Sequence, residues 1–126
     1  MERRVFLALA EAGFDLTPAQ ARLVARIAPG GSRLTELAAQ AQVTKQTAGV
    51  LVDQLVRNGY LKREPDPRDG RARLLVPDER GRQAVEVANR AARQVEDEWI
   101  THLGSRAARD LRSSLELLRE ITDPYR

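Results

Sequence analysis

The residues best suited to chemistry in this sequence are cationic and lie close together after residue 60. They are Lys62, Arg63, Arg68, Arg71 and Arg73, interspersed with a few carboxylates. Lysine and arginine bind phosphate oxygens, and arginine also enters the narrow minor groove of A·T-rich DNA. Arg68 is predicted to enter a minor groove with Arg71 helping to position it, and the other three are phosphate candidates. Taken alone, a solvated charged turn is the plainer interpretation.

A second polar group precedes this turn, on a segment with helical periodicity that begins after Thr44 and ends at Asn58-Gly59. One face is apolar and is predicted to pack in the core: Val43, Ala48, Leu51, Val52 and Leu55. The first residues of a recognition helix meet base edges, where lysine contacts guanine or phosphate and glutamine reads adenine. The predicted DNA contacts here are Lys45, Gln46, Thr47, Gly49, Val50, Gln54 and Arg57. An ordinary surface helix is the alternative.

Caps, stops and periodicity predict the elements that position these residues. Helices are expected over 2–12, 18–28, 34–41, 44–58, 79–103 and from after Ser105 to about 122, and strands over 60–64 and 71–76, with Ser32-Arg33 as a one-bridge strand. Thr17 and Gln20 form a capping-box pattern around Pro18, Ser105 is a predicted N-cap, and Asp123-Pro124 ends the last helix. Two short helices followed by a hairpin predict a mainly α, winged helix-turn-helix fold.

The two C-terminal helices carry apolar stripes that a lobe made of residues 18–76 cannot cover. The last helix presents Ala108, Leu111, Leu115, Leu118 and Ile121 on one face. With no other partner encoded, a symmetric homodimer is the simplest way to bury them. The predicted organisation is therefore an N-terminal dimerisation helix over 1–16, a DNA-binding lobe over 17–78 and C-terminal dimerisation helices over 79–126.

Composition narrows the functional classes. The 126 residues fit one domain, and 42% are apolar but only 4% aromatic, which predicts a core of Leu, Val and Ala. The net charge of +3 permits a polyanionic partner. The absence of cysteine excludes disulfides and thiolate metal sites. No apolar run reaches the roughly 18–20 residues of a membrane span, so we expect a soluble, cytoplasmic protein.

No catalytic, metal or cofactor site is predicted. His102 is the only histidine and lies near a helix end beside Trp99, so a structural role is the simpler interpretation. The acidic run 96–98 points in different directions around a helix, and Ser113-Ser114 has no base nearby. No phosphate-binding loop motif is present. Trp99 is a candidate for lining an effector pocket, although core or dimer packing is the plainer role.

The stretch over residues 16–82 resembles the MarR family of bacterial transcription regulators. The run L-V-x-x-L-x-x-x-G-Y-L-x-R is met by Leu51 through Arg63, and the wing pattern D-x-R-x-x-R by Asp66, Arg68 and Arg71. The resemblance implies a homodimer that binds a pseudo-palindromic duplex, with recognition helices in major grooves and wings in flanking minor grooves. It also implies a repressor released by a small aromatic or phenolic ligand. Oxidant sensing, known for cysteine-bearing members, is excluded here because this chain has no cysteine.

Two other classes stay open from the residues alone. A winged helix can serve as a protein-interaction module whose long helices bind a partner and whose basic face has no DNA function. An enzyme is the more remote alternative, since no pair of catalytic groups is recognisable. A salt series separates the first alternative from DNA binding, because phosphate contacts weaken steeply as salt rises.

Overall fold

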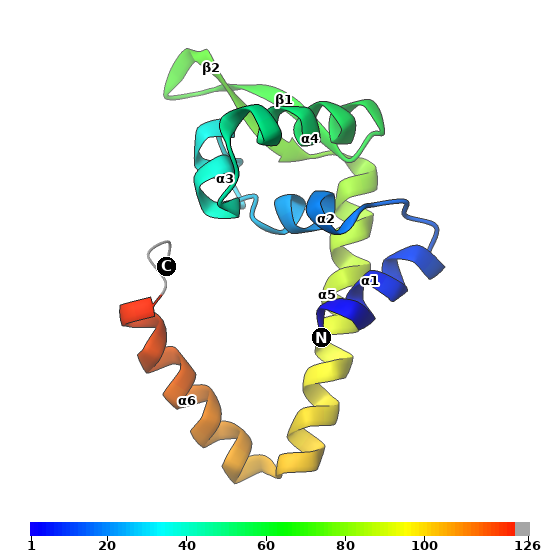
Figure 1. Cartoon of the computed structure of the whole chain (residues 1–126), viewed down its shortest axis with the longest axis vertical. Coiled ribbons are helices and arrows are strands. Elements are labelled where there is room, and N and C mark those ends of the chain that lie inside the picture. Colours follow the sequence, from blue (N-terminus) through cyan, green and yellow to red (C-terminus); the bar gives the residue numbers. More distant parts are fainter. Residues whose placement is uncertain (123–126) are drawn as a thin grey trace.

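The computed structural model describes residues 1–122, and within that range it has six helices and one antiparallel hairpin. In chain order the elements are α1 (Glu2–Glu11), α2 (Pro18–Ala25), α3 (Leu34–Ala41), α4 (Lys45–Arg57), β1 (Leu61–Asp66), β2 (Asp69–Pro77), α5 (Glu79–Leu103) and α6 (Ser105–Thr122). Figure 1 shows a lobe of α2, α3, α4 and the hairpin, from which α5 runs out as a long arm with α1 beside it. The predicted fold class is confirmed.

Local caps explain where the lobe helices begin. The hydroxyl of Thr17 accepts the Gln20 backbone N–H at 3.1 Å, and the Gln20 side chain accepts the Thr17 N–H at 3.0 Å, which confirms the capping box. Thr44 likewise accepts the Thr47 N–H at 3.1 Å at the start of α4. Helix α2 stops at Ala25, three residues earlier than predicted. The next two N–H groups, of Arg26 and Ile27, donate to carbonyls only three residues back, and the Ser32 hydroxyl then accepts the Ala28 N–H.

The core of the lobe forms where α2, α3, α4 and the hairpin meet. Its largest fully buried apolar side chains are Leu23, Leu37, Val52, Leu55, Tyr60 and Leu61. The connection from α3 to α4 is tight because Gln42 adopts a left-handed conformation with φ of 56°, which is uncommon outside glycine. This short turn fixes α4 against α3 as a helix-turn-helix.

The hairpin is longer and its turn tighter than predicted. The strands reach Asp66 and Asp69, so only Pro67 and Arg68 lie between them, with an irregular register after Pro65. The prolines suggested an open turn, but proline is compatible with an edge strand where no ladder donor is needed. The predicted one-residue bridge is confirmed, since Ser32 pairs with Leu75 through backbone hydrogen bonds of 3.1 and 2.8 Å.

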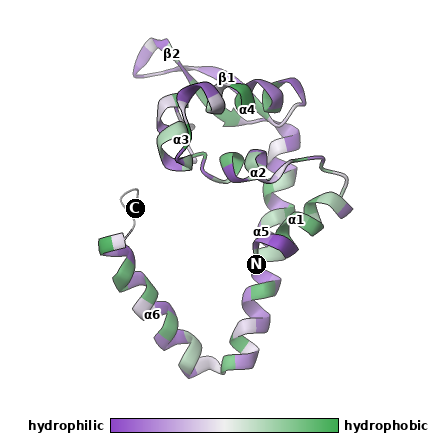
Figure 2. Cartoon of the chain, in the orientation of Figure 1, coloured by the Kyte–Doolittle hydropathy of each residue, from purple (hydrophilic) through white to green (hydrophobic). Residues whose placement is uncertain are grey.

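The arm packs on the lobe where it begins and is exposed where it ends. A Cβ added at Gly81 would lie 2.0 Å from the Tyr60 carbonyl oxygen, so the first turn of α5 packs directly on backbone. Ala84, Ala91 and Val95 of α5 are buried, whereas α6 has no buried residue within its described length. Figure 2 shows apolar positions recurring along the whole described length of α6.

The start of the last helix differs from expectation by one residue. Ser105 is the first residue of α6 rather than its N-cap, because the Gly104 carbonyl already accepts the Ala108 N–H at 3.0 Å. The predicted stop at Asp123-Pro124 lies outside the described residues. No helix in the part of the chain that the structure describes is long and apolar enough to cross a membrane.

Candidate nucleic-acid interface

The outer face of α4 is polar in its first turn, and the opposite face packs in the core. Lys45, Gln46 and Thr47 are exposed in the first turn, and Val50 follows with 53% of its surface accessible. A Cβ added at Gly49 would lie 4.0 Å from its nearest neighbour, a methyl carbon of Leu34, so this position is open to a close approach. Ala48, Val52 and Leu55, predicted for the opposite face, are buried.

Gln54 lies differently from the other predicted contacts of this helix. It is half-buried, and its side-chain oxygen accepts a hydrogen bond of 2.9 Å from the Gln20 amide nitrogen on α2. The Gln54 side chain is therefore hydrogen-bonded to α2 and does not project freely from α4. Arg57 is exposed in the last turn, at the far end of the helix from Lys45.

The wing tip presents one arginine and buries one aspartate. The Arg68 side chain is 82% exposed, whereas the Asp66 side chain is 0% exposed. One Asp66 oxygen accepts the Arg68 backbone N–H at 2.9 Å, and the other accepts Nε and Nη2 of Arg33 at 3.0 and 2.7 Å. These bonds, that of Arg68 first and that of Arg33 second, hold the pKa of Asp66 below its ordinary value. Asp69 accepts the Arg71 N–H at 3.1 Å, which shapes the other side of the turn.

Arg33 is a residue of this site that the sequence does not single out as a DNA-interface residue. A basic residue just before a helix carries no local signal of a long-range partner. Its relation to the wing depends on pairing across the Ser32–Leu75 bridge, which brings residues 33 and 66 together.

A basic groove runs between α4 and the hairpin and joins the two predicted contact regions. It has a volume of about 530 Å³ and is lined in part by Arg33, Lys45, Arg63 and Arg73, and among the described residues that line it only Asp53 is acidic. Asp53 pairs with Arg63 on β1 rather than with Arg57, four residues further along α4, because the hairpin brings β1 against this face of α4. Lys62 lies outside this groove and pairs with Glu64 at 3.3 Å.

A polar cluster supports α4 from the side of the arm. The Tyr60 hydroxyl donates to an Asp15 carboxylate oxygen at 2.7 Å, and Arg80 lies over the Tyr60 ring at 4.6 Å from its centroid. Arg80 also donates to the Asn58 carbonyl at 3.2 Å, just beyond the end of α4. Burial first, and then the bond to Asp15, raises the pKa of Tyr60 above its ordinary value. No pattern in the sequence indicates this junction.

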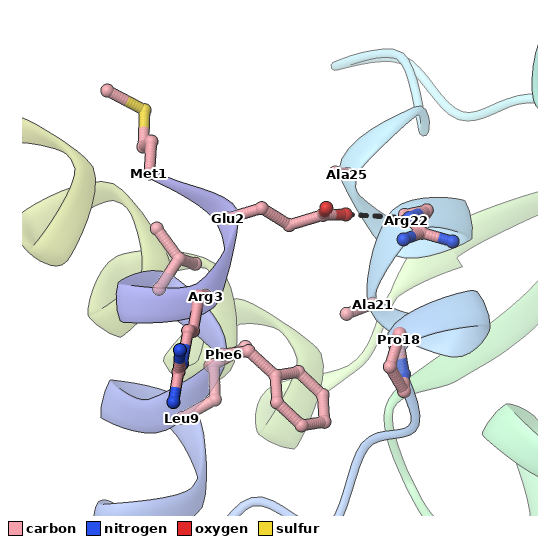
Figure 3. A pocket seen from close by; sticks show the side chains of 10 residues that line it. Met1, Glu2, Arg3, Phe6, Leu9, Pro18, Ala21, Arg22 and Ala25 are labelled. Carbon is pink, nitrogen blue, oxygen red and sulfur yellow. Dashed lines mark hydrogen bonds and ion pairs between the residues drawn. The ribbon is translucent and has the colours of Figure 1, made fainter.

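A hollow of a different character lies between α1 and α2 (Figure 3). It has a volume of about 590 Å³, and Figure 3 shows Phe6 reaching from α1 toward Pro18 and Ala21. Its rim carries an ion pair of 2.6 Å between Glu2 and Arg22, which lowers the pKa of Glu2. Trp99 does not line it and is instead 51% exposed on α5.

The described residues contain no group of three or more side chains placed to hold a metal ion. A helix-turn-helix with a polar first turn, a basic groove and an arginine-tipped hairpin defines a winged helix-turn-helix protein. The sequence model of the MarR family matches residues 14–72, from the loop before α2 into β2, so this part of the chain is similar to that family. This match supports a DNA-binding transcription regulator.

Solved structures agree with this assignment. The chain is 28% identical to the transcriptional regulator Tm0710 of Thermotoga maritima, covering 97% of this chain and 85% of that one with a TM-score of 0.68. S. aureus MepR bound to ethidium bromide shares the fold at 19% identity, with 94% and 86% covered and a TM-score of 0.73. A MepR mutant bound to an oligodeoxyribonucleotide does so at 18%, with 94% and 87% covered and a TM-score of 0.65. No curated protein matches the chain in sequence.

Proposed function

We propose that two copies of this chain bind a pseudo-palindromic operator in double-stranded DNA and repress transcription from it. Each α4 lies in a major groove, where its first turn contacts base edges, and each Arg68 enters the flanking minor groove. Arg71 helps to position the tip, and Lys45, Lys62, Arg63 and Arg73 contact phosphates. MepR, whose mutant was solved with an oligodeoxyribonucleotide, supports the same kind of partner.

The observation that carries this proposal is the basic groove between α4 and the hairpin. A single sugar-phosphate backbone separates a major groove from the adjacent minor groove. With α4 in the major groove and the hairpin in the minor groove, that backbone must pass between α4 and the hairpin. The groove occupies that position, and its cationic lining includes Lys45 from α4 and Arg63 and Arg73 from the hairpin. The acid of this lining, Asp53, is already paired with Arg63, so it repels phosphate less than a free carboxylate does.

The dimer is proposed from the uncovered face of the arm. Large apolar side chains are exposed on α5 and α6: Trp99, Ile100, Leu103, Leu111, Leu115, Leu117, Leu118 and Ile121. So many large apolar side chains left exposed on two helices indicate an interface, and a second copy offers the same residues in return. Pairing two lobes at a fixed distance is what a palindromic operator requires.

Ligand control is proposed at the hollow between α1 and α2. Its lining is largely apolar and includes Phe6, which suits a small aromatic or phenolic molecule. MepR bound to ethidium bromide supports an aromatic ligand for this fold. A ligand between α1 and α2 shifts the lobe relative to the arm and so changes the spacing of the two recognition helices. Screening small aromatics for release of bound duplex tests this part separately.

A salt titration of duplex binding tests the central proposal. Polarisation with a labelled duplex selected from a random pool is expected to show affinity that falls linearly with the logarithm of salt concentration. Lys45→Ala and Arg73→Ala are each expected to reduce that slope by about one unit. An interaction module without DNA function shows no salt-dependent duplex affinity, and that result rejects the proposal.

A further inference from the structure

The tip of the hairpin has almost no apolar core of its own. Between residues 63 and 73, Asp66 is buried at 1% exposed and Ala72 is half-buried. All the other residues of this stretch are exposed. A two-stranded hairpin is only marginally stable by itself in water. What fixes the direction of Arg68 must therefore be found in the contacts of Asp66.

The carboxylate of Asp66 is divided between two arginines. Its Oδ1 accepts the Arg68 backbone N–H at 2.9 Å and lies 3.7 Å from Arg68 Nε. Its Oδ2 accepts both Nε and Nη2 of Arg33, at 3.0 and 2.7 Å. A buried carboxylate needs such partners, because leaving it unpaired away from water is costly.

Arg33 is itself held in place by the helix-turn-helix. It precedes α3 as the N-cap residue, with its N–H directed to Glu36 at 3.4 Å. The adjacent Ser32 is bonded to Leu75 through both backbone hydrogen bonds. The hairpin is thus fixed to the start of α3 at two points, at Leu75 near its base and at Asp66 at its tip.

We propose that Arg33 is a positioning residue for minor-groove recognition: through Asp66 it sets the direction in which Arg68 leaves the wing. This inference rests on the proposed function, and it adds a residue that makes its contribution without touching the minor groove. The fork of a guanidinium is needed, since Nε and Nη2 both bond one oxygen and leave the other for Arg68. A lysine ammonium offers a point charge without that fixed geometry.

The test compares two duplexes from the same random-pool selection, identical except that the segments flanking the half-sites are A·T-rich or G·C-rich. The wild-type protein is expected to prefer the A·T flanks, because the narrow minor groove attracts arginine. Arg68→Ala is expected to reduce that preference by about tenfold. Arg33→Ala is expected to reduce it to the same extent, and the double variant no further, because both residues act through one contact.

Control variants separate positioning from folding and from charge. Arg26→Ala removes one exposed cation just after α2 and is expected to keep the A·T preference. Arg33→Lys is expected to show an A·T preference between those of the wild type and Arg33→Ala. If Arg33→Ala fails to fold, Asp66→Asn replaces it, since Asn keeps an oxygen for the Arg68 N–H but loses the charge facing Arg33.

The outcomes test the positioning role of Arg33 separately from the proposed DNA binding. A wild-type preference that survives Arg33→Ala or Asp66→Asn, or losses that multiply in the double variant, overturns the positioning role while leaving DNA binding intact. A wild-type protein that binds duplex without any flank preference also overturns it. Absence of any salt-dependent duplex binding by the wild type overturns the proposed function itself.

Discussion

Gln20 donates a hydrogen bond of 2.9 Å from its side-chain nitrogen to the side-chain oxygen of Gln54, and so joins α2 to the recognition helix. The orientation follows from the chain itself. The Thr17 backbone N–H can only donate, so the Gln20 oxygen must face it and the Gln20 nitrogen must face Gln54. One buried amide thereby caps α2 and fixes a residue at the edge of the proposed DNA-binding face.

Gln20→Ala is expected to destabilise the folded protein by about 1–2 kcal/mol, because it removes half of a capping box and a buried hydrogen bond. Urea unfolding followed by circular dichroism measures the change. Gln94→Ala, at an exposed glutamine of α5, is the matched control and is expected to stay within about 0.5 kcal/mol of wild type. Equal effects of the two substitutions would show that neither the capping bond nor the Gln20–Gln54 bond contributes to stability.

Arg68→Ala is expected to weaken binding to the selected duplex by about 1–3 kcal/mol, because the exposed guanidinium at the wing tip is lost from the minor groove. Polarisation titration at fixed salt measures it. Arg93→Ala, an exposed arginine on the arm, serves as the charge-matched control and is expected to leave affinity nearly unchanged. If Arg68→Ala binds the duplex with wild-type affinity, the wing is not part of the DNA interface.

Asp66 predicts a pH dependence at the acid end. Its pKa is lowered in the folded protein, first by the Arg68 backbone N–H and then by Arg33, so its contribution to stability is complete above the ordinary value of 3.8. That contribution is lost as the pH falls through the lowered folded value. The difference in stability between wild type and Asp66→Asn is therefore expected to shrink below pH 3.8. Urea unfolding at neutral and acid pH measures it, and a difference that grows on acidification contradicts the assignment.

Leu115→Glu combined with Leu118→Glu is expected to convert the proposed dimer to monomers, because two charges then lie on the exposed apolar face of α6. Sedimentation equilibrium measures the mass. Ser113→Glu places a charge on the opposite side of the same helix and is expected to leave the dimer intact. A double variant that keeps the wild-type mass places the interface elsewhere.

The elements that the sequence predicts well are those whose signals are local. Thr17 with Gln20, Thr44, and the glycines at 59 and 104 lie at helix ends, where a cap or a stop acts on its own backbone neighbours, so most predicted helix bounds are close to those observed. The predicted N-cap of α6 is one residue late for the same local reason, since Ser105 is a good cap but Gly104 supplies the carbonyl.

The contacts that the sequence does not reveal are made between distant residues. Helical spacing pairs Asp53 with Arg57, yet the hairpin supplies Arg63 instead. Arg33 and Asp66 are 33 positions apart, and no periodicity relates them. The position of Gln54 around its helix predicts a contact in the DNA major groove. Only the packing of α2 shows that its side-chain oxygen accepts a hydrogen bond from Gln20. Polar side chains choose partners by tertiary geometry, which a pattern of apolar residues does not encode.

Selection of bound duplexes from a random pool tests the central claim most directly. The account predicts enrichment of an inverted repeat whose half-sites are centred about 10–10.5 base pairs apart or a multiple of that spacing, with A·T-rich steps beyond each half-site where the wings reach. Enrichment of a single unrepeated site contradicts the paired arrangement. A pool that shows no enrichment over successive rounds contradicts sequence-specific DNA binding.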